Sequence, residues 1–293
     1  MNRTEADGGW VLMGTQLVPA DAARVPVFDR GLLFAHSAYE VTAVFNGRPI
    51  DPGAHFDRLA RTLAALELPL PHDPETLHAL QDALIGRNAL NEGLVYLQVT
   101  AGDYGGRDFA GPLELRPQLF GFCTHKPLIG DAARDGIAAI TLADERWKRR
   151  DLKTTQLLSQ ALAYRRARAA GAQTAVMHEE GLVTEAASAN LWMVTPAGRL
   201  VTRDLSPAIL AGVTRAAILE SRLDVEERAF SLEEARSARE LFTSSTGAMI
   251  LPVVDLDGAP VGDGRPGRIT RQVQRHYYTR IGARLAHRAP WLD

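Results

Sequence analysis

The spacing of apolar residues predicts both strands and helices in the first part of the chain. "YEVTAVFNGRPI", residues 39 to 50, places Asn46 and Gly47 between two strand-like runs, the usual signal of a tight hairpin. "DPGAHFDRLARTLAALEL" follows, with Phe56, Leu59 and Leu63 on one side of an amphipathic helix. A second helix near residues 75 to 90 leads into the strands "LVYLQVTAG" and "PQLFGFCT". These residues predict an α+β domain over 1 to 126.

The second part repeats this mixture after a break. "HKPLIGDAARDG" loses the periodicity and gathers Gly, Pro and Asp, so residues 127 to 135 are expected to form a linker. The strand "IAAITLA" comes next, then a helix whose apolar residues, Leu157, Leu158, Ala161 and Leu162, should pack inward. Further strands are expected around "TAVMHE", "GLVTEA", "NLWMVT", 224 to 229 and 249 to 254, and further helices near 212 to 222, 231 to 239 and from 267. Residues 136 to 293 therefore predict a larger α+β domain, with a cleft between the two domains.

Composition narrows the class of protein. A chain of 293 residues can build two cores, and its net charge of −2, with acids and bases interspersed, gives no sign of a nucleic-acid partner. The single cysteine, Cys123, allows no disulfide framework, and the eight histidines show no metal-ligand spacing, so no metal is expected. No apolar stretch is long enough for a membrane span. We expect a cytoplasmic protein without a membrane partner.

One lysine is a candidate nucleophile. The chain has only three lysines, Lys126, Lys148 and Lys153, among 33 basic residues. Arginine stays protonated at any biological pH, whereas a desolvated lysine amine can lose its proton and attack a carbonyl carbon. Lys153 in "DLKTTQLLSQ" precedes the apolar helix, and the cations just upstream would lower its pKa if they lie close. From the residues alone, Lys153 is either such a nucleophile or a surface cation at a helix start.

Three further segments could bind a flat, phosphorylated ligand. "TEAASAN" surrounds Glu185 with small residues, and Glu185 is either a surface carboxylate at a strand end or a buried one that would need a cation such as a protonated pyridine nitrogen. "ILAGVTRAAILE" places Val213 and Thr214 at a predicted helix start, where backbone N–H groups bind phosphate or Thr214 simply caps the helix. "TSSTGAM", which contains Thr246, could cradle a phosphate or be an ordinary turn.

Seven stretches, in chain order, resemble the fold-type IV enzymes that use pyridoxal 5'-phosphate (PLP), and within them the D-amino-acid aminotransferases. They are "VFDRGLLFAHSAYEVTAVFNG", "HFDRL", "GLVYLQVTAG", "RRDLKTTQLLSQALA", "GLVTEAASANLWMV", "ILAGVTR" and "DGAPVGDGRPG". The resemblance covers nearly the whole chain. It implies a two-domain α+β fold with a small N-terminal domain and a larger C-terminal PLP-binding domain. It also implies a homodimer that moves an amino group from a D-amino acid to a 2-oxo acid.

The resemblance also implies a role for each matching residue. Lys153 would form the Schiff base with PLP, and Glu185 would pair with the pyridine nitrogen. The remaining positions contact the phosphate, the ring or the substrate carboxylate: Arg58, Val213, Thr214 and Thr246 for the phosphate, Leu210 for the ring, and Tyr39 and Arg107 for the carboxylate.

The chain departs from the family pattern around the expected carboxylate site. Ala35, His36 and Ser37 stand where the family has a glycine and an acid, Ala101 replaces an arginine, and Phe109 replaces a histidine. Alternatives therefore remain: an R-selective amine transaminase, an aminodeoxychorismate lyase-like enzyme, or a non-catalytic protein that retains the fold.

Overall fold

The chain divides into two compact units. The computed structural model describes residues 9–221 and 223–292. One unit comprises Met1–Pro127 together with Leu152–Gln156, and the other comprises Leu128–Asp151 and Leu157–Asp293. The sequence predicts Lys153 in the C-terminal domain, but its short segment packs with the first unit. The expected linker, residues 127 to 135, contains a short helix, and all of it beyond Pro127 belongs to the second unit.

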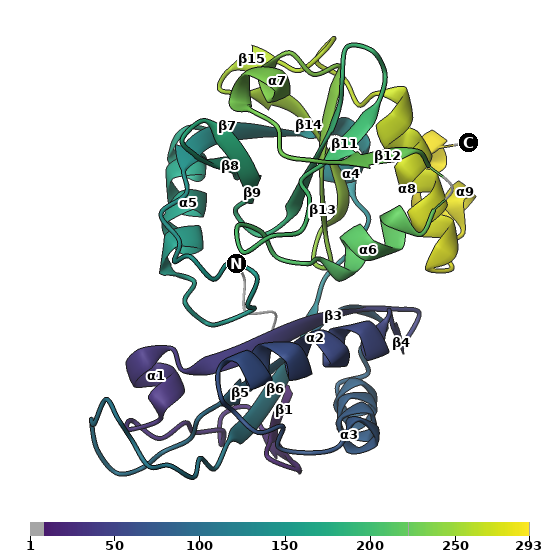
Figure 1. The fold of residues 1–293 in the computed structure, drawn as a ribbon. Coiled ribbons are helices and arrows are strands. Elements are labelled where there is room, and N and C mark those ends of the chain that lie inside the picture. Colours follow the sequence, from purple (N-terminus) through teal and green to yellow (C-terminus); the bar gives the residue numbers. More distant parts are fainter. Residues whose placement is uncertain (1–8, 222, 293) are drawn as a thin grey trace. The chain divides into compact units, whose positions relative to one another are not determined.

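Within the described residues, the first unit contains a six-stranded antiparallel sheet in the order β2-β1-β6-β5-β3-β4 (Figure 1). Asn46 and Gly47 join β3 to β4 with φ angles of 53° and 71°, the left-handed geometry that a two-residue hairpin turn requires, so the predicted hairpin is confirmed. The strands are β1 (Trp10–Met13), β2 (Gln16–Pro19), β3 (Ser37–Phe45), β4 (Arg48–Pro49), β5 (Glu92–Thr100) and β6 (Gln118–His125).

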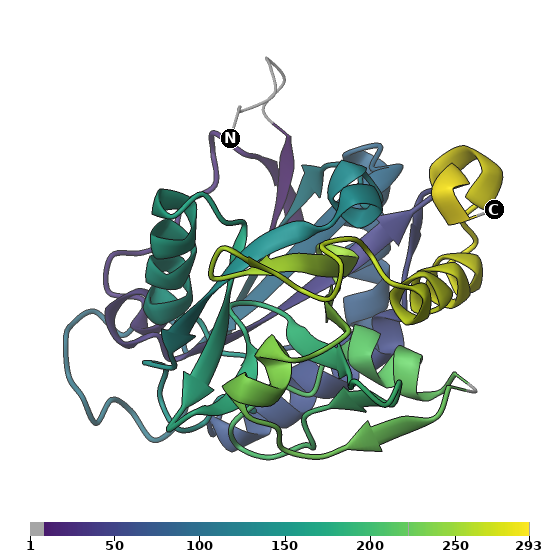
Figure 2. The same cartoon turned by 90° about the horizontal axis from the view of Figure 1, so that it is seen from above.

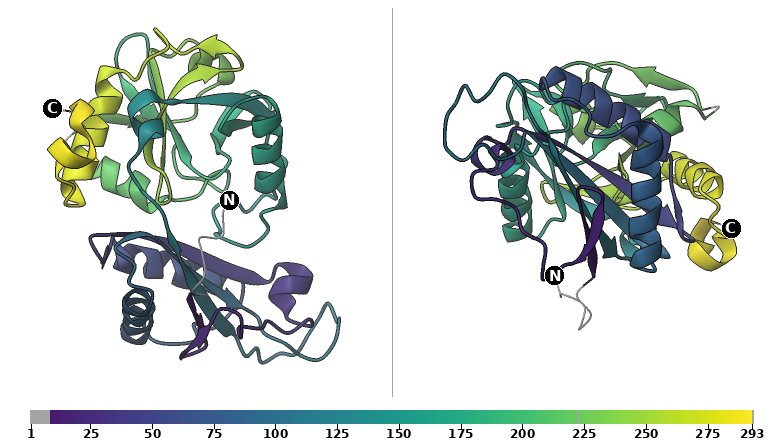
Figure 3. Two further views of the ribbon diagram at one scale, coloured as in Figure 1. Left: turned by 180° about the vertical axis from the view of Figure 1, so that it is seen from behind. Right: turned by 90° about the horizontal axis from the view of Figure 1, so that it is seen from below.

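Helices cover one face of this sheet. The helices of the unit are α1 (Arg30–Phe34), α2 (Pro52–Ala65) and α3 (Pro74–Arg87), and Figure 3 shows α2 and α3 side by side over the strands. Leu59 and Leu63 of α2 and Leu84 of α3 are buried against Val95 and Leu97 of β5. The alternate residues of each strand point to the opposite face of the sheet, since side chains alternate along a strand. Tyr39, which alternates with the core residue Ala38, points to that second face.

The second unit is built on a mixed sheet of nine strands among the residues that the structure describes. The order is β12-β11-β10-β13-β14-β7-β8-β9, with β15 paired to β14. The pairs β11/β12, β14/β7 and β7/β8 are parallel. The strands are β7 (Ile137–Ala143), β8 (Thr174–Glu179), β9 (Leu182–Ala186), β10 (Asn190–Val194), β11 (Leu200–Thr202), β12 (Val225–Glu227), β13 (Glu240–Ser245), β14 (Met249–Leu256) and β15 (Ala259–Pro260).

Helices surround this sheet, and α5 and α8 lie on opposite sides of its strands (Figures 1 and 2). The helices are α4 (Asp131–Asp135), α5 (Leu158–Ala169), α6 (Val213–Leu219), α7 (Leu232–Arg236), α8 (Arg268–Arg280) and α9 (Leu285–Arg288), with a 3₁₀ turn at Pro290–Leu292. The predicted helix after Lys153 exists but begins at Leu158. Its inward face consists of Ala163 and Ala167, whereas Leu158 is 73% and Leu162 37% exposed, so the expected leucine packing was wrong. No helix in the described part of the chain has the length and hydropathy to cross a bilayer.

Candidate active site

The segment that carries Lys153 is fixed by its backbone to β3. Tyr39 N donates to Lys153 O at 3.0 Å, and Ala38 forms an isolated antiparallel bridge with Thr154. β4 pairs with β3 only at Val44 and Phe45, so the N-terminal half of β3 has an edge that this segment can pair with. Lys153 is therefore positioned by a strand-like pairing and not by a helix start.

The Lys153 amine has an aromatic neighbour. Its Nζ lies 4.2 Å from the ring centroid of Tyr39, and Tyr39 in turn stacks on Tyr96 of the next strand. Among the described residues, no carboxylate lies within ion-pair distance of Nζ, and Nζ donates no hydrogen bond. The lysine is half-buried. The amine is therefore held by an aromatic face and not by an ion pair.

Arg58 lies in a buried charge cluster with Glu40 and His55. Arg58 donates from Nε and Nη2 to the two oxygens of Glu40 at 2.7 and 2.8 Å, and His55 Nδ1 lies 2.7 Å from Glu40 Oε2. Burial alone would raise the pKa of Glu40, but Arg58 and then His55 outweigh it and lower this pKa to about 2. Burial lowers the pKa of His55. Glu40 is therefore ionised throughout the physiological range and fixes the Arg58 guanidinium.

Arg107 is separate from these groups. It is exposed on the segment after β5, and its guanidinium carbon lies 4.7 Å from the Phe109 ring and 5.7 Å from the Phe34 ring. Buried Arg30 anchors this segment by donating to the carbonyl oxygens of Asp108 and Phe109 at 2.6 and 2.9 Å. The structure thus brings Tyr39 and Lys153 into contact, and it records no contact between either of them and Arg107.

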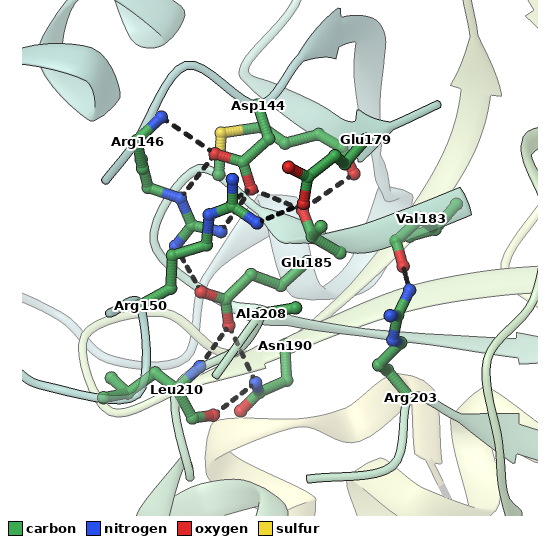
Figure 4. Close-up of polar contacts among 12 residues, drawn as sticks. Asp144, Arg146, Arg150, Glu179, Val183, Glu185, Asn190, Arg203, Ala208 and Leu210 are labelled. Atoms are coloured by element: carbon green, nitrogen blue, oxygen red, sulfur yellow. Dashed lines mark hydrogen bonds and ion pairs between the residues drawn. The ribbon is translucent and has the colours of Figure 1, made fainter. Parts of the chain in front are cut away.

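Glu185 lies near the end of β9 in the second unit and is 4% exposed. Figure 4 shows its hydrogen-bond donors: Arg146 Nη1 at 2.5 Å from Oε1, and Asn190 Nδ2 and Leu210 N at 3.0 and 3.3 Å from Oε2. Burial raises the pKa of Glu185, and the Arg146 guanidinium offsets only part of this effect. This carboxylate is buried and incompletely compensated within the second unit.

Arg146 connects Glu185 to a larger charge cluster. Its Nε and Nη2 donate to the two oxygens of Asp144 at 2.9 and 2.7 Å, which aims Nη1 at Glu185 (Figure 4). Arg150 Nε lies 3.4 Å from Asp144 Oδ2, and its Nη1 donates to Glu179 at 2.8 Å. From the sequence, the cations upstream of Lys153 were expected only to lower the pKa of its amine if they lay close. The structure shows Arg150 paired with carboxylates.

Of the residues expected around a phosphate, Arg58 belongs to α2 of the first unit, and the other three lie in two turns of the second unit. Val213 and Thr214 are buried in the first turn of α6, and Gly212, not Thr214, is the N-cap. A Cβ at Gly212 would lie 2.1 Å from Asn190 Oδ1, so only glycine fits there. Thr246 is half-buried in the turn after β13. Leu210, just before Gly212, donates its N–H to Glu185 and accepts from Asn190 Nδ2 at 2.9 Å, so these segments meet at one place.

The residues of these clusters that were not identified from the sequence include Glu40, Arg146 and Asn190. Glu40 lies an even number of residues from Ala38 and Val44 along β3, so the three side chains share one face of the sheet. Ala38 and Val44 belong to the core under the helices. That alternation could have placed Glu40 on the helix-covered face. Arg146 carries no such signal, since it is one arginine among many and its partners are 2 and 39 residues away.

Comparison of the sequence with known proteins identifies its family. The model of the family described as amino-transferase class IV matches residues 37–256. The chain belongs to class IV of the aminotransferases. It is 36% identical over 277 residues to a D-alanine aminotransferase of Listeria innocua, covering 92% of this chain and 96% of that one. It is 32% identical over 279 residues to a D-alanine aminotransferase of Staphylococcus haemolyticus, covering 94% and 98%.

Solved structures of aminotransferases share this fold. The branched-chain amino acid aminotransferase of Escherichia coli superposes with a TM-score of 0.85 at 24% identity, covering 93% of this chain and 94% of that one. A hypothetical aminotransferase from Mycobacterium tuberculosis, in its PLP-bound form, gives a TM-score of 0.81 at 21% identity, covering 94% of this chain and 99% of that one. The predicted fold-type IV architecture is confirmed.

Proposed function

We propose that this class IV aminotransferase uses PLP to move an amino group from a D-amino acid to a 2-oxo acid. The observation that carries the proposal is the Lys153 amine, held by backbone pairing over Tyr39 without a carboxylate partner among the described residues. The choice of D-amino acids is supported by the D-alanine aminotransferases that share about a third of their residues with this chain over nearly its full length.

The second unit fits a phosphorylated pyridine. Glu185 is a buried carboxylate whose pKa is raised by burial, and a cationic ring nitrogen would compensate it. Gly212 leaves the backbone before Val213 and Thr214 without a side chain, next to the Asn190 amide that also holds Glu185. A carboxylate for the ring and a glycine-started helix for the phosphate are thus linked through Asn190.

Each residue then has a defined task. Val213 and Thr214 through their backbone, Thr246, and Arg58 hold the phosphate, and Leu210 packs on the ring. When bound, PLP supplies an electron sink for the carbanion left by removal of the substrate α-proton. Lys153 Nζ would hold the cofactor, and as a free amine it would take the proton from the substrate α-carbon and later give one up. Glu185 keeps a positive charge on the ring nitrogen.

The activity is tested with the PLP-loaded enzyme and four amino donors: D-alanine, D-glutamate, L-leucine and R-1-phenylethylamine. We expect oxo product from the D-amino acids and little from L-leucine. Borohydride reduction of the loaded enzyme should add the mass of the reduced cofactor to the peptide that contains Lys153, and not to those with Lys126 or Lys148. Modification of another lysine, or none, would contradict the proposal.

We also propose that Tyr39 and Arg107 receive the substrate carboxylate. Arginine offers two parallel donors to a carboxylate, and Arg107 is the cation of its segment nearest the aromatic pair Phe34 and Phe109. Arg107→Ala should lower kcat/KM for D-alanine. The fall should correspond to a loss of transition-state stabilisation on the order of 2 to 5 kcal/mol. The same variant should act on R-1-phenylethylamine, which has no carboxylate, as the parent does.

If kcat/KM of Arg107→Ala fell equally with both donors, or did not fall with D-alanine, Arg107 would not be the residue that binds the substrate carboxylate. Arg116→Ala, which changes another basic residue after β5, is the matched control. It should leave kcat/KM unchanged for both D-alanine and R-1-phenylethylamine. If R-1-phenylethylamine proved the better donor with the parent enzyme, the amine-transaminase alternative would replace the amino-acid function.

We propose a homodimer as well. On α5 the side chains of Leu158, Leu162 and Tyr164 are 73%, 37% and 38% exposed. Apolar side chains gathered on one short helix are typical of a surface that another subunit covers. Sedimentation of the purified enzyme should give twice the mass of one chain, and a monomer at micromolar concentration would contradict this.

A further inference from the structure

The second unit holds Glu185 with donors of two kinds. Asn190 Nδ2 and Leu210 N are neutral and both bind Oε2, whereas Arg146 Nη1 binds Oε1 at 2.5 Å and is the one charged donor among the described residues. A carboxylate has about four acceptor positions. These donors use three of them, so one position remains for another group.

Arg146 is itself held in a fixed orientation. Its guanidinium makes a two-pronged contact with Asp144, whose side chain is buried and also accepts from the hydroxyl of Thr184 at 2.7 Å. Arg146 has a side-chain exposure of only 6%. A planar guanidinium with two of its nitrogens bound to one carboxylate cannot turn away, so Nη1 is directed at Glu185 by the structure.

Glu185 depends on Arg146 more than Asp144 does. Asp144 also faces Arg150, whose Nε lies 3.4 Å from Asp144 Oδ2, whereas Arg146 is the one charged contact of Glu185 among the described residues. Glu179, the other carboxylate that pairs with Arg150, has a side chain that is 49% exposed, so solvent shares in its compensation. Burial of a weakly compensated charge is unfavourable, so a cationic ligand on the remaining acceptor position of Glu185 would be favoured.

We propose that Arg146 is a positioning residue that keeps Glu185 ionised beneath the cofactor, so that the proton shared by Glu185 and the ring nitrogen stays on the ring. This inference rests on the proposed PLP-dependent function. Arg146 touches Glu185, and any group that hydrogen-bonds the carboxylate from the remaining position is farther from the guanidinium. Since Coulomb energy falls with distance, Arg146 stabilises the negative Glu185 more than it destabilises the positive ring.

Burial pushes in the opposite direction. It raises the pKa of Glu185 even with Arg146 present, so without Arg146 the carboxyl would hold a proton more strongly still. The ring nitrogen would then accept a hydrogen bond from a neutral carboxyl and lose its charge. The ring withdraws electrons from the substrate effectively only while it is cationic, so turnover would fall although the cofactor remains bound.

The experiment uses the enzyme loaded with PLP that carries ¹⁵N in its ring. The ¹⁵N chemical shift should indicate a protonated nitrogen in the parent and in Arg146→Lys, which keeps the charge. In Arg146→Gln it should move toward the value of a neutral pyridine, and turnover should fall by about tenfold or more. Arg150→Gln is the matched control, because Arg150 is equally buried and also pairs with Asp144 but does not contact Glu185; its ¹⁵N shift should be that of the parent.

A second measurement needs no cofactor. The infrared spectrum of ligand-free Arg146→Gln should show a protonated carboxyl band that disappears in Arg146→Gln/Glu185→Gln. A parent-like ¹⁵N shift in Arg146→Gln would overturn the inference. So would failure of both Arg146→Gln and Arg146→Met to fold while Arg150→Gln folds, because Arg146 would then be structural. Failure of the parent to bind PLP at Lys153 would instead overturn the proposed function.

Discussion

Each unit buries a glutamate against an arginine, and the two glutamates behave in opposite ways. Glu40 in the first unit binds Arg58 through both oxygens and His55 as well, and its pKa is lowered to about 2. Glu185 in the second unit has one charged contact among the described residues, with Arg146, and burial raises its pKa. Two hydrogen bonds from Arg58, with His55, outweigh desolvation at Glu40, whereas the single one from Arg146 does not outweigh it at Glu185.

This difference separates a structural role from a chemical one. Glu40 is permanently charged and serves to hold Arg58. Glu185 retains an acceptor position and an incompletely balanced charge, which are the properties needed to share a proton with a ligand. Substitutions in the two units can test that separation.

The largest effect should come from the Lys153 amine of the first unit. Lys153→Ala removes the covalent anchor and the proton carrier, so turnover should fall by roughly three orders of magnitude or more. Lys148→Ala, which removes an exposed amine five residues upstream, is the matched control and should retain parent activity. Steady-state assays measure both, and Lys153→Ala activity within a few-fold of the parent would show that the reactive amine is elsewhere.

The next effect distinguishes the two glutamates directly. Glu40→Gln leaves Arg58 buried without its charge partner and should lower the free energy of unfolding by about 3 to 5 kcal/mol. Glu185→Gln leaves Arg146 bound to Asp144, so stability should change by about 1 kcal/mol or less. Turnover of Glu185→Gln should instead fall by about a hundredfold, with Glu185→Asp less damaging.

Urea unfolding and kcat measure these two outcomes. If Glu185→Gln lost as much stability as Glu40→Gln and kept its turnover, the assignment of roles would be reversed.

The smallest effect is in the pH dependence of stability. Glu40 has a lowered pKa in the folded state, so its contribution is present above its unfolded pKa and is lost as the pH falls toward about 2. The pKa of His55 is also lowered, so its contribution to stability likewise decreases as the pH falls, beginning nearer neutral pH. Glu185 has a raised pKa, so the folded state gains stability from it as the pH falls.

Urea titrations at about pH 7 and about pH 4 should therefore show the stability deficit of Glu40→Gln shrinking on acidification. Glu185→Gln should move the other way and become less stable relative to the parent on acidification, because the parent gains stability from protonating Glu185. If the free energies of unfolding of the two variants changed in the same way with pH, the opposite pKa shifts of Glu40 and Glu185 would be contradicted.

Local patterns in the sequence were sufficient for much of the fold. The Asn46-Gly47 hairpin and α2 were predicted correctly because a turn dipeptide and a helical apolar stripe act over a few residues. The helix after Lys153 was predicted with the wrong inward face. Its leucines matched a helical period, but the small Ala163 and Ala167 are what pack against the sheet, and tertiary packing decides between such faces.

The clusters were only partly predictable. Lys153 was identified because lysine is rare in this chain, and Glu185 because its neighbours are small. Arg146 could not be found in this way, since its meaning depends on a partner 39 residues away that only folding brings to it. The assignment of Lys153 to the first unit was also unpredictable, because the pairing of its segment with β3 joins residues that are far apart in the chain, Ala38 and Thr154.

The placement of Leu152–Gln156 has a consequence for how the protein is made. This segment completes the first unit, yet Leu128–Asp151, which belongs to the second, is synthesised before it. Domains usually fold in the order in which they leave the ribosome. Here the backbone groups at the edge of β3 remain unpaired until part of the second unit has left the ribosome. The first unit therefore cannot complete its fold before synthesis of the second unit has begun. Lys153 is among the last residues to join the first unit, and a chain stalled at Pro127 would expose that edge to chaperones or to aggregation.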